Sequence, residues 1–165
     1  EAKEKLPIVK KEKGGIVVKG IDDVAVRFAK CCSPIPGDEI VGFVMRGRGV
    51  TIHRTDCVNV MNLSESERVR LIDAEWQGVE EDSSAATYTT EISIFANNRI
   101  GMFVDISKIF TEREIDIKTM NSRVNKQGKA TIVMTFDIHG IEELNKLSDK
   151  LRQIEGVLDI ERTAG

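Results

Sequence analysis

The metal-binding side chains of this chain are confined to one short stretch. All three cysteines, Cys31, Cys32 and Cys57, and one of only two histidines, His53, lie between positions 31 and 57. Zinc prefers four such ligands in a tetrahedron, and the spacing of His53 and Cys57 is usual for two ligands that leave one turn. Adjacent cysteines on a strand point to opposite faces, so the pair can share one ion only where the backbone turns. The Ser-Pro-Ile-Pro-Gly segment at 33–37 predicts that turn.

Three buried free thiols are the alternative to zinc, because cysteine often packs as a small apolar side chain. A disulfide is disfavoured, since the number of cysteines is odd and no apolar signal segment precedes them. No apolar run approaches the roughly 20 residues of a membrane-spanning helix. We therefore expect a soluble, cytoplasmic protein without membrane contact. The charged residues 1–13, which begin with Glu rather than Met, predict a linker within a longer protein.

The distribution of charge predicts two domains. Residues 63–88 hold seven Asp or Glu against two Lys or Arg, whereas the segments on either side are close to balanced. The stretch 77–86 is acidic and serine-rich and lacks apolar periodicity, which is typical of a linker. We place a first domain at 14–76 and a second domain at 87–165.

The first domain has the pattern of short strands separated by glycine and proline. β-Branched and apolar residues recur between turn signals. The candidate strands lie at 15–21, 40–45, 49–53 and 69–76. Asp56 can cap a short helix that begins at Cys57. A hydrophobic core of this size gives only marginal stability without a disulfide or a bound metal, which favours a structural metal here.

Basic side chains near the cysteines predict a nucleic-acid contact. Two arginines occupy a glycine-flanked turn, Met-Arg-Gly-Arg-Gly-Val at 45–50, where they stand clear of the sheet and can donate paired hydrogen bonds to phosphates. The candidate RNA-binding residues are Lys30, Arg46, Arg48 and Arg54. Phe28 and Phe43 sit in apolar strand patterns and are expected in the core, so no aromatic stacking platform is predicted. A solvated basic surface is the alternative interpretation.

The second domain has a clearer architecture, with alternating runs that predict strands and helical spacing that predicts helices. The strands are expected at 89–96, 115–119, 130–138 and 157–160, and the helices at 101–114 and 141–154. The order is βαββαβ, the ferredoxin-like arrangement of an antiparallel sheet with two helices on one face. The fold class is therefore α+β, a small β-rich domain followed by a ferredoxin-like domain.

The sheet of the second domain leaves its other face and its edges uncovered. Phe95, Met120 and Val133 fall on the alternation opposite to the core-facing residues, so this second face has apolar side chains to bury. Closed two-fold symmetry is the commonest way to bury them, and we expect a homodimer through this domain.

Three motifs in the first domain carry a family resemblance. They are RFAKCCSPIPGDEIVGF at 27–43, RGRGV at 46–50 and HRTDC at 53–57. In this order and spacing they closely resemble the C-terminal regulatory half of the long RelA/SpoT family of guanosine tetraphosphate synthetases and hydrolases, the enzymes of the stringent response. The resemblance implies a zinc-finger-like, or ribosome-intersubunit, domain followed by an ACT domain. It also implies one zinc ion, held by the family's Cys-Cys and His-Arg-x-Asp-Cys positions.

The strand-to-helix turn of the second domain matches the family pattern in part. It reads Asn-Arg-Ile-Gly-Met-Phe at 98–103, where the family usually resembles Asp-Arg-Pro-Gly-Leu-Leu. Free N–H groups at a helix N-terminus suit a ligand carboxylate, and the resemblance suggests a branched-chain amino acid. The candidate ligand-binding residues are Asn97, Asn98, Gly101 and Met102. A tight strand-to-helix connection is the alternative interpretation.

Three functional hypotheses follow for a chain that lacks a Ser/His/Asp constellation and a phosphate-cradling glycine loop. The first is a non-catalytic regulatory module that docks on ribosomal RNA and restrains the N-terminal catalytic domains of the parent enzyme. The parent is expected to be a GTP diphosphokinase and a guanosine-bis(diphosphate) 3′-diphosphohydrolase. The second is an amino-acid-sensing dimer, and the third is a purely structural dimerisation module.

Overall fold

The computed structural model describes residues 16–18, 25–47, 49–76 and 86–163, which belong to two compact units. The first unit precedes Thr87, and the second unit spans Thr87–Thr163. The linkers expected at 1–13 and 77–86 lie outside the described residues, apart from Ala86. Among the helices described, none has the length and apolar character that crossing a membrane requires.

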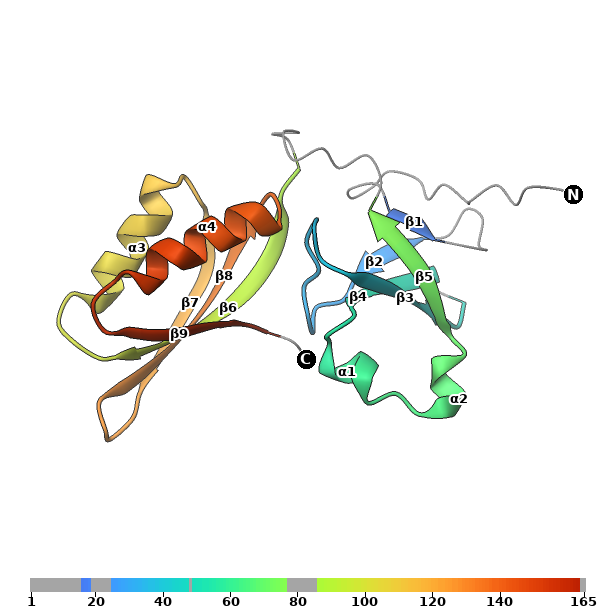
Figure 1. Cartoon of the computed structure of the whole chain (residues 1–165), viewed down its shortest axis with the longest axis horizontal. Coiled ribbons are helices and arrows are strands. Elements are labelled where there is room, and N and C mark those ends of the chain that lie inside the picture. Colours follow the sequence, from blue (N-terminus) through green and yellow to red (C-terminus); the bar gives the residue numbers. More distant parts are fainter. Residues whose placement is uncertain (1–15, 19–24, 48, 77–85, 164–165) are drawn as a thin grey trace, which may run out of the picture. The chain divides into compact units, whose positions relative to one another are not determined.

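The first unit is built on a five-stranded sheet with the order β1-β5-β3-β4-β2 (Figure 1). Its strands are β1 (Ile16–Val18), β2 (Val26–Phe28), β3 (Ile40–Met45), β4 (Gly49–Arg54) and β5 (Leu71–Trp76). Strand β2 pairs in parallel with β4, and the other neighbours are antiparallel. The sequence did not predict β2, because three residues are too few to show alternation.

The two faces of this sheet have different neighbours. One face carries the apolar core, in which Phe28 stacks on Trp76 with ring centroids 5.6 Å apart. Directly paired residues share a face, and the register therefore places Arg27, Phe43 and Thr51 together on the other face. A second, smaller apolar cluster surrounds Cys32 and Cys57.

Two short helices connect β4 to β5. Helix α1 (Val58–Met61) begins after Cys57 without a side-chain cap. The expected cap by Asp56 is therefore wrong, and that carboxylate binds Arg54 instead. Helix α2 (Glu65–Arg68) has a capping box, in which Ser64 and Glu67 each accept a hydrogen bond from the other's backbone N–H.

The second unit has the predicted βαββαβ order, and both helices lie on one face of its sheet (Figure 1). Its elements are β6 (Tyr88–Asn97), α3 (Met102–Glu112), β7 (Ile117–Val124), β8 (Lys129–Ile138), α4 (Ile141–Arg152) and β9 (Val157–Arg162). The sheet order is β7-β8-β6-β9. Isoleucines of β6 and β8 pack against the helices, where Phe110 meets Phe136 edge to face at 5.0 Å. The α+β fold class is confirmed.

The register decides which side chains lie on the uncovered face of the second sheet. Phe95 and Val133 lie there and are half-buried, as the alternation predicts. Met120 does not, because it pairs with the buried Met134 on the helix side. The sequence assigned Met120 wrongly since the pairing shifts by one residue between Ile117 and Thr119, which reverses the alternation that follows.

Candidate metal centre and nucleic-acid interface

The structure brings the four soft ligands together. The ligand atoms of Cys31, Cys32, His53 and Cys57 all lie within 4.8 Å of one another, and this cluster can hold a metal ion. The Cys31 Sγ lies 3.6 Å from the Cys57 Sγ and 3.5 Å from the His53 Nδ1, and the Cys32 Sγ lies 3.9 Å from the same nitrogen. All three cysteines are free, so the contact between Cys31 and Cys57 is not a disulfide.

A turn after β2 makes this convergence possible. The Ser33 N–H donates to the Ala29 carbonyl, and Ser33 has a positive φ of 46°, which reverses the chain at the cysteine pair. His53 stands near the end of β4, and Cys57 lies at the start of α1. The neighbouring cysteines can therefore face the same point, as the 33–37 segment predicted.

Burial shifts the pKa values of two of these ligands, Cys32 and His53. Desolvation, opposed by a hydrogen bond from the Arg54 backbone and reinforced by the neighbouring thiols, raises the pKa of Cys32 to about 12. Burial lowers the pKa of His53, so its imidazole is neutral at neutral pH. Neutral imidazole is the form that binds metals, whereas the buried Cys32 thiol needs a nearby cation to become a thiolate.

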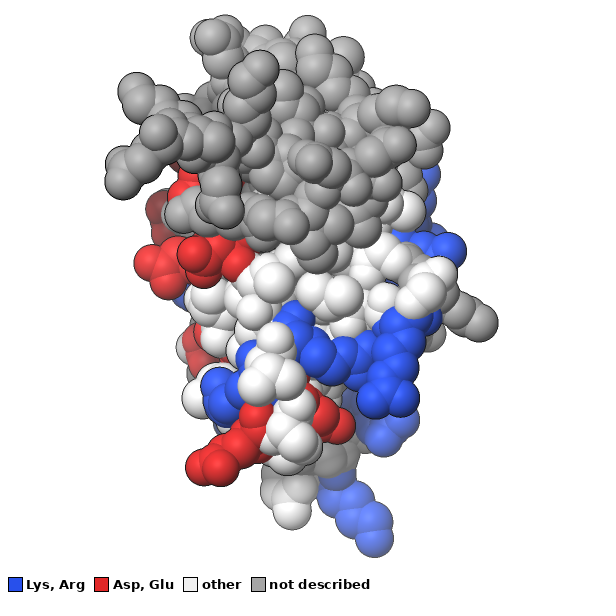
Figure 2. Space-filling model, turned by 90° about the vertical axis from the view of Figure 1, so that its right-hand side faces the viewer, with Lys and Arg blue, Asp and Glu red and all other residues white. Residues whose placement is uncertain are grey.

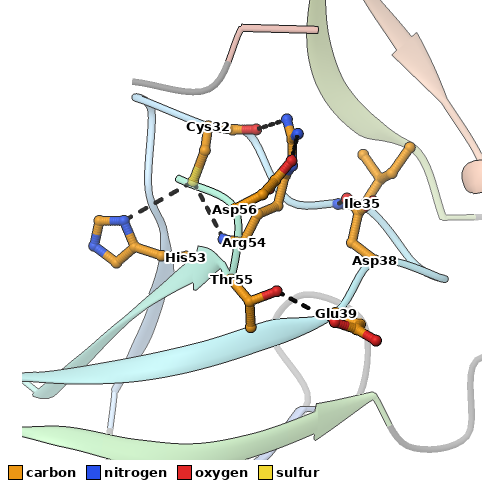
Figure 3. A network of polar contacts seen from close by, with 8 residues as sticks. All are labelled: Cys32, Ile35, Asp38, Glu39, His53, Arg54, Thr55 and Asp56. Atoms are coloured by element: carbon orange, nitrogen blue, oxygen red, sulfur yellow. Dashed lines mark hydrogen bonds and ion pairs between the residues drawn. The ribbon is translucent and has the colours of Figure 1, made fainter. Parts of the chain in front are cut away.

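Arg54 lies inside this site rather than on the surface (Figure 3). Only 6% of it is exposed. Its backbone N–H donates to the Cys32 Sγ at 3.3 Å, its Nη1 donates to the Cys32 carbonyl at 3.2 Å, and its Nη2 pairs with the Asp56 carboxylate at 2.5 Å. The structure therefore separates Arg54 from the other expected phosphate contacts.

The outer face of the first sheet carries the remaining basic side chains. The Arg70 guanidinium lies 4.7 Å above the ring of Phe43, and its Nε donates to the Val44 carbonyl at 2.9 Å. Arg27 lies on the same face and is exposed. The sequence analysis missed this pair because Phe43 was assigned to the core. Only the strand pairing shows that Phe43 lies on the face opposite to Gly42 and Val44, which face the core.

The structure describes two of the three remaining candidate RNA-binding residues. Arg46 is exposed in the turn between β3 and β4, and Lys30 is exposed in the turn before the cysteines. Arg48 lies outside the described residues. Figure 2 shows several Lys and Arg side chains on one face, with Asp and Glu side chains to their left and between some of them.

The strand-to-helix turn of the second unit is tightly tied to its neighbours. The Asn97 and Asn98 N–H groups donate to the Gly156 and Gly128 carbonyls, and the Asn97 side chain accepts from the Lys129 amine. Met102 is fully buried, so its side chain belongs to the core. Gly101 immediately precedes α3 and has a φ of 83°, a left-handed conformation that glycine adopts readily.

An arginine that the sequence analysis passed over covers this turn. Arg99 donates to the Glu155 and Ile100 carbonyls and pairs with the Asp105 carboxylate at 2.7 Å. The first turn of α3 thus already carries a carboxylate of its own chain. A ligand carboxylate at Gly101 would have to compete with Asp105 for this guanidinium.

Comparison with known proteins gives concordant matches for both units. The model of the RelA/SpoT RIS domain matches residues 16–77, and that of the ACT domain matches residues 84–162. GTP pyrophosphokinase from Escherichia coli (strain K12) is 37% identical over 156 residues, which cover 94% of this chain and 20% of that protein. GTP pyrophosphokinase from Streptomyces coelicolor is 35% identical over 148 residues, which cover 90% of this chain and 17% of that protein.

A solved structure is similar to the second part of the chain. The crystal structure of the ACT domain from GTP pyrophosphokinase of Chlorobium tepidum shares 26% sequence identity and a TM-score of 0.42, covering 47% of this chain and 99% of that one. This chain spans about a fifth of the length of the curated relatives it matches. The chain therefore belongs to the RelA/SpoT family, and it consists of that family's RIS domain followed by an ACT domain, the pairing of its C-terminal regulatory region.

Proposed function

We propose that this chain is the non-catalytic regulatory segment of a cytoplasmic GTP pyrophosphokinase, and that its first unit docks on ribosomal RNA. In this proposal, docking controls the synthetase and hydrolase domains of the same polypeptide. One observation carries the docking role: the outer face of the first sheet presents an arginine–phenylalanine pair, and exposed Arg27 lies on the same face, with Thr51 of β4 between them. The match to a RIS domain supports the same assignment.

The chemistry of this face suits an RNA with unpaired bases. Phe43 and the Val44 carbonyl fix the orientation of the Arg70 guanidinium. A planar guanidinium held in this way can stack on an unpaired base. Arg27 and Arg46 can contact phosphates beside the base. Because the whole chain has a net charge of −3, we expect a local contact rather than general affinity for nucleic acid.

The docking proposal predicts the salt dependence of ribosome binding. Replacing Arg27, Arg46 or Arg70 by alanine is expected to reduce the slope of log affinity against log salt by about one for each lost phosphate contact. Binding to purified ribosomes is measured by co-sedimentation across a salt series. Arg113→Ala in the second unit is the control and should leave the slope unchanged. A triple variant of the first unit that binds as tightly as the unmodified chain would contradict the proposal.

We also propose that the cluster of cysteines and histidine binds one zinc ion. Zinc bond lengths of about 2.3 Å to sulfur and about 2.0–2.1 Å to nitrogen give tetrahedral edges of about 3.8 Å between sulfurs and about 3.6 Å between sulfur and nitrogen. Three of the six separations, 3.6, 3.5 and 3.9 Å, are close to these edges, and all four ligand atoms lie within 4.8 Å of one another. Zinc bound there would tie the cysteine turn to the end of β4 and to α1, where the surrounding apolar cluster is small.

A second candidate role, dimerisation through the ACT domain, is favoured by the charge pattern of the uncovered sheet face. Phe95 and Val133 occupy its middle, Asp159 and Glu161 of β9 lie on one side, and Arg123 of β7 lies on the other. A two-fold axis through the middle would place the acidic side of each copy against the basic side of its partner.

This arrangement predicts that Val133→Glu weakens dimerisation by at least about tenfold, because it would bury an unpaired charge. Val124→Glu is the control, since Val124 is exposed but pairs with Ala130 on the helix side. Analytical ultracentrifugation of the full chain gives the dissociation constant, with valine or isoleucine added in separate runs. A chain that stays monomeric at high micromolar concentration would exclude the dimer. An unchanged constant with both amino acids would exclude the sensor.

A further inference from the structure

Arg54 is the one charged residue that is buried among the described residues. Burying a guanidinium is costly unless its charge and its donors are satisfied. The side chain lies between the cysteine turn and the segment that runs from His53 to Cys57 (Figure 3). The position of Arg54 between the two ligand segments therefore suggests a role in the metal centre.

The contacts of Arg54 join the two halves of the ligand set. On one side its Nη1 binds the carbonyl of Cys32, and on the other its Nη2 binds Asp56, the residue before Cys57. Its backbone is used as well: the N–H donates to the Cys32 Sγ, and the carbonyl accepts from the Cys57 N–H at 3.1 Å. One residue thus contacts both segments that supply cysteine ligands.

The metal-loaded site would be negatively charged, and a nearby positive side chain would stabilise it. A divalent ion bound by three thiolates and one neutral imidazole carries a net charge of −1. Asp56 is largely exposed, so water screens much of its charge, whereas the guanidinium is buried. Arg54 is therefore placed to offset the negative charge of the loaded site.

We propose that Arg54 is a positioning residue of the metal centre, which fixes the orientation of Cys32 and offsets the charge of the bound thiolates. This inference rests on the proposed metal binding. It replaces a phosphate contact with an interior role, and the two roles have different consequences. Loss of a phosphate contact would weaken RNA binding at full metal occupancy, whereas loss of a positioning residue lowers the affinity for the metal.

The test compares Arg54→Ala, Arg54→Lys and the control Arg68→Ala, an exposed arginine on α2 whose guanidinium donates to the Met61 carbonyl. Zinc affinity of the full chain is measured by competition with a chelating dye. Arg54→Ala is expected to weaken it by about 10–100-fold, the usual effect of losing a residue that orients ligands. Arg54→Lys, which keeps the charge but cannot bind both acceptors in a fork, is expected to fall between Arg54→Ala and the unmodified chain. Arg68→Ala should match the unmodified chain.

Cobalt(II) in place of zinc gives a second readout that general destabilisation would not change. The ligand-field and sulfur-to-cobalt absorption bands report the geometry of the ligands, and both are expected to shift in Arg54→Ala at saturating metal. This comparison at saturation also serves where the metal-free variant does not fold. Unchanged zinc affinity and an unchanged cobalt spectrum in Arg54→Ala would overturn the inference while leaving metal binding intact. Failure of the unmodified chain to bind either metal would overturn both.

Discussion

Removing zinc from the cluster is expected to unfold the first unit and to leave the second unit folded. Structural zinc contributes about 10–16 kcal/mol of apparent binding free energy, which is as large as the about 5–15 kcal/mol of total stability typical of a domain. The apolar cluster around Cys32 and Cys57 is small, so little else holds the cysteine turn against α1. The second unit has its own core of isoleucines, leucines and phenylalanines and does not contain the metal ligands.

Trp76 makes this prediction easy to measure. It is the only tryptophan of the chain and packs against Phe28 in the core of the first unit, so its fluorescence reports that unit alone. Far-ultraviolet circular dichroism follows the helices of the second unit. A strong chelator should shift the Trp76 emission to the red, and added zinc should restore it.

The matched variants for this experiment are Cys57→Ser and His139→Ala. Cys57 is fully buried in the cluster, whereas His139 is the other histidine and binds Glu143 at the start of α4. Cys57→Ser should lower the melting temperature seen by Trp76, and His139→Ala should not. A metal-free protein that melts at the same temperature with and without zinc would contradict the structural role of the metal.

The parts of the fold that depend on local patterns could be predicted from the sequence. The second unit is the clearest case, because Leu144, Leu147 and Leu151 recur at helical spacing and the strands alternate. The Ser-Glu-Ser-Glu segment at 64–67 also has the local pattern of a capping box, which is a sequence signal for α2. The clustering of Cys31, Cys32, His53 and Cys57 was predictable because the chain has only three cysteines and two histidines, and four of these five lie within one short stretch.

The parts that depend on long-range register could not be predicted. The alternation around Phe43 is equally compatible with a core position, and only the pairing of β3 with β4 decides which face it occupies. Arg54 follows a metal-ligating histidine, but nothing local shows that the Cys32 carbonyl lies within reach of its guanidinium. Both residues acquire their roles from segments more than twenty positions away.

Replacing Gly49 by alanine is expected to be among the most damaging single substitutions in the first unit. Gly49 has a φ of 85°, and a Cβ added there would lie 2.1 Å from the Ala25 carbonyl oxygen. That oxygen accepts the Val50 N–H at 2.8 Å, the contact that begins the parallel pairing of β2 with β4. Because the obstacle is backbone, the strands must separate, and we expect a loss of at least about 4 kcal/mol.

Gly47 in the same hairpin supplies the matched control. Its φ is 68°, but no atom lies within 4 Å of an added Cβ, so Gly47→Ala has the backbone strain without the steric clash. The expected cost of that strain is about 1–2 kcal/mol. Guanidinium denaturation at saturating zinc, followed by Trp76 fluorescence, gives both free energies of unfolding.

The difference between the free energies of unfolding of the two variants measures the effect of the steric clash between β4 and Ala25. Because β4 also carries His53, Gly49→Ala is expected to lower zinc affinity as well, whereas Gly47→Ala should leave it unchanged. Equal destabilisation by the two substitutions would show that strain at positive φ accounts for the whole effect. The close approach of β2 to the start of β4 would then contribute nothing to the stability of the unit that holds the metal centre.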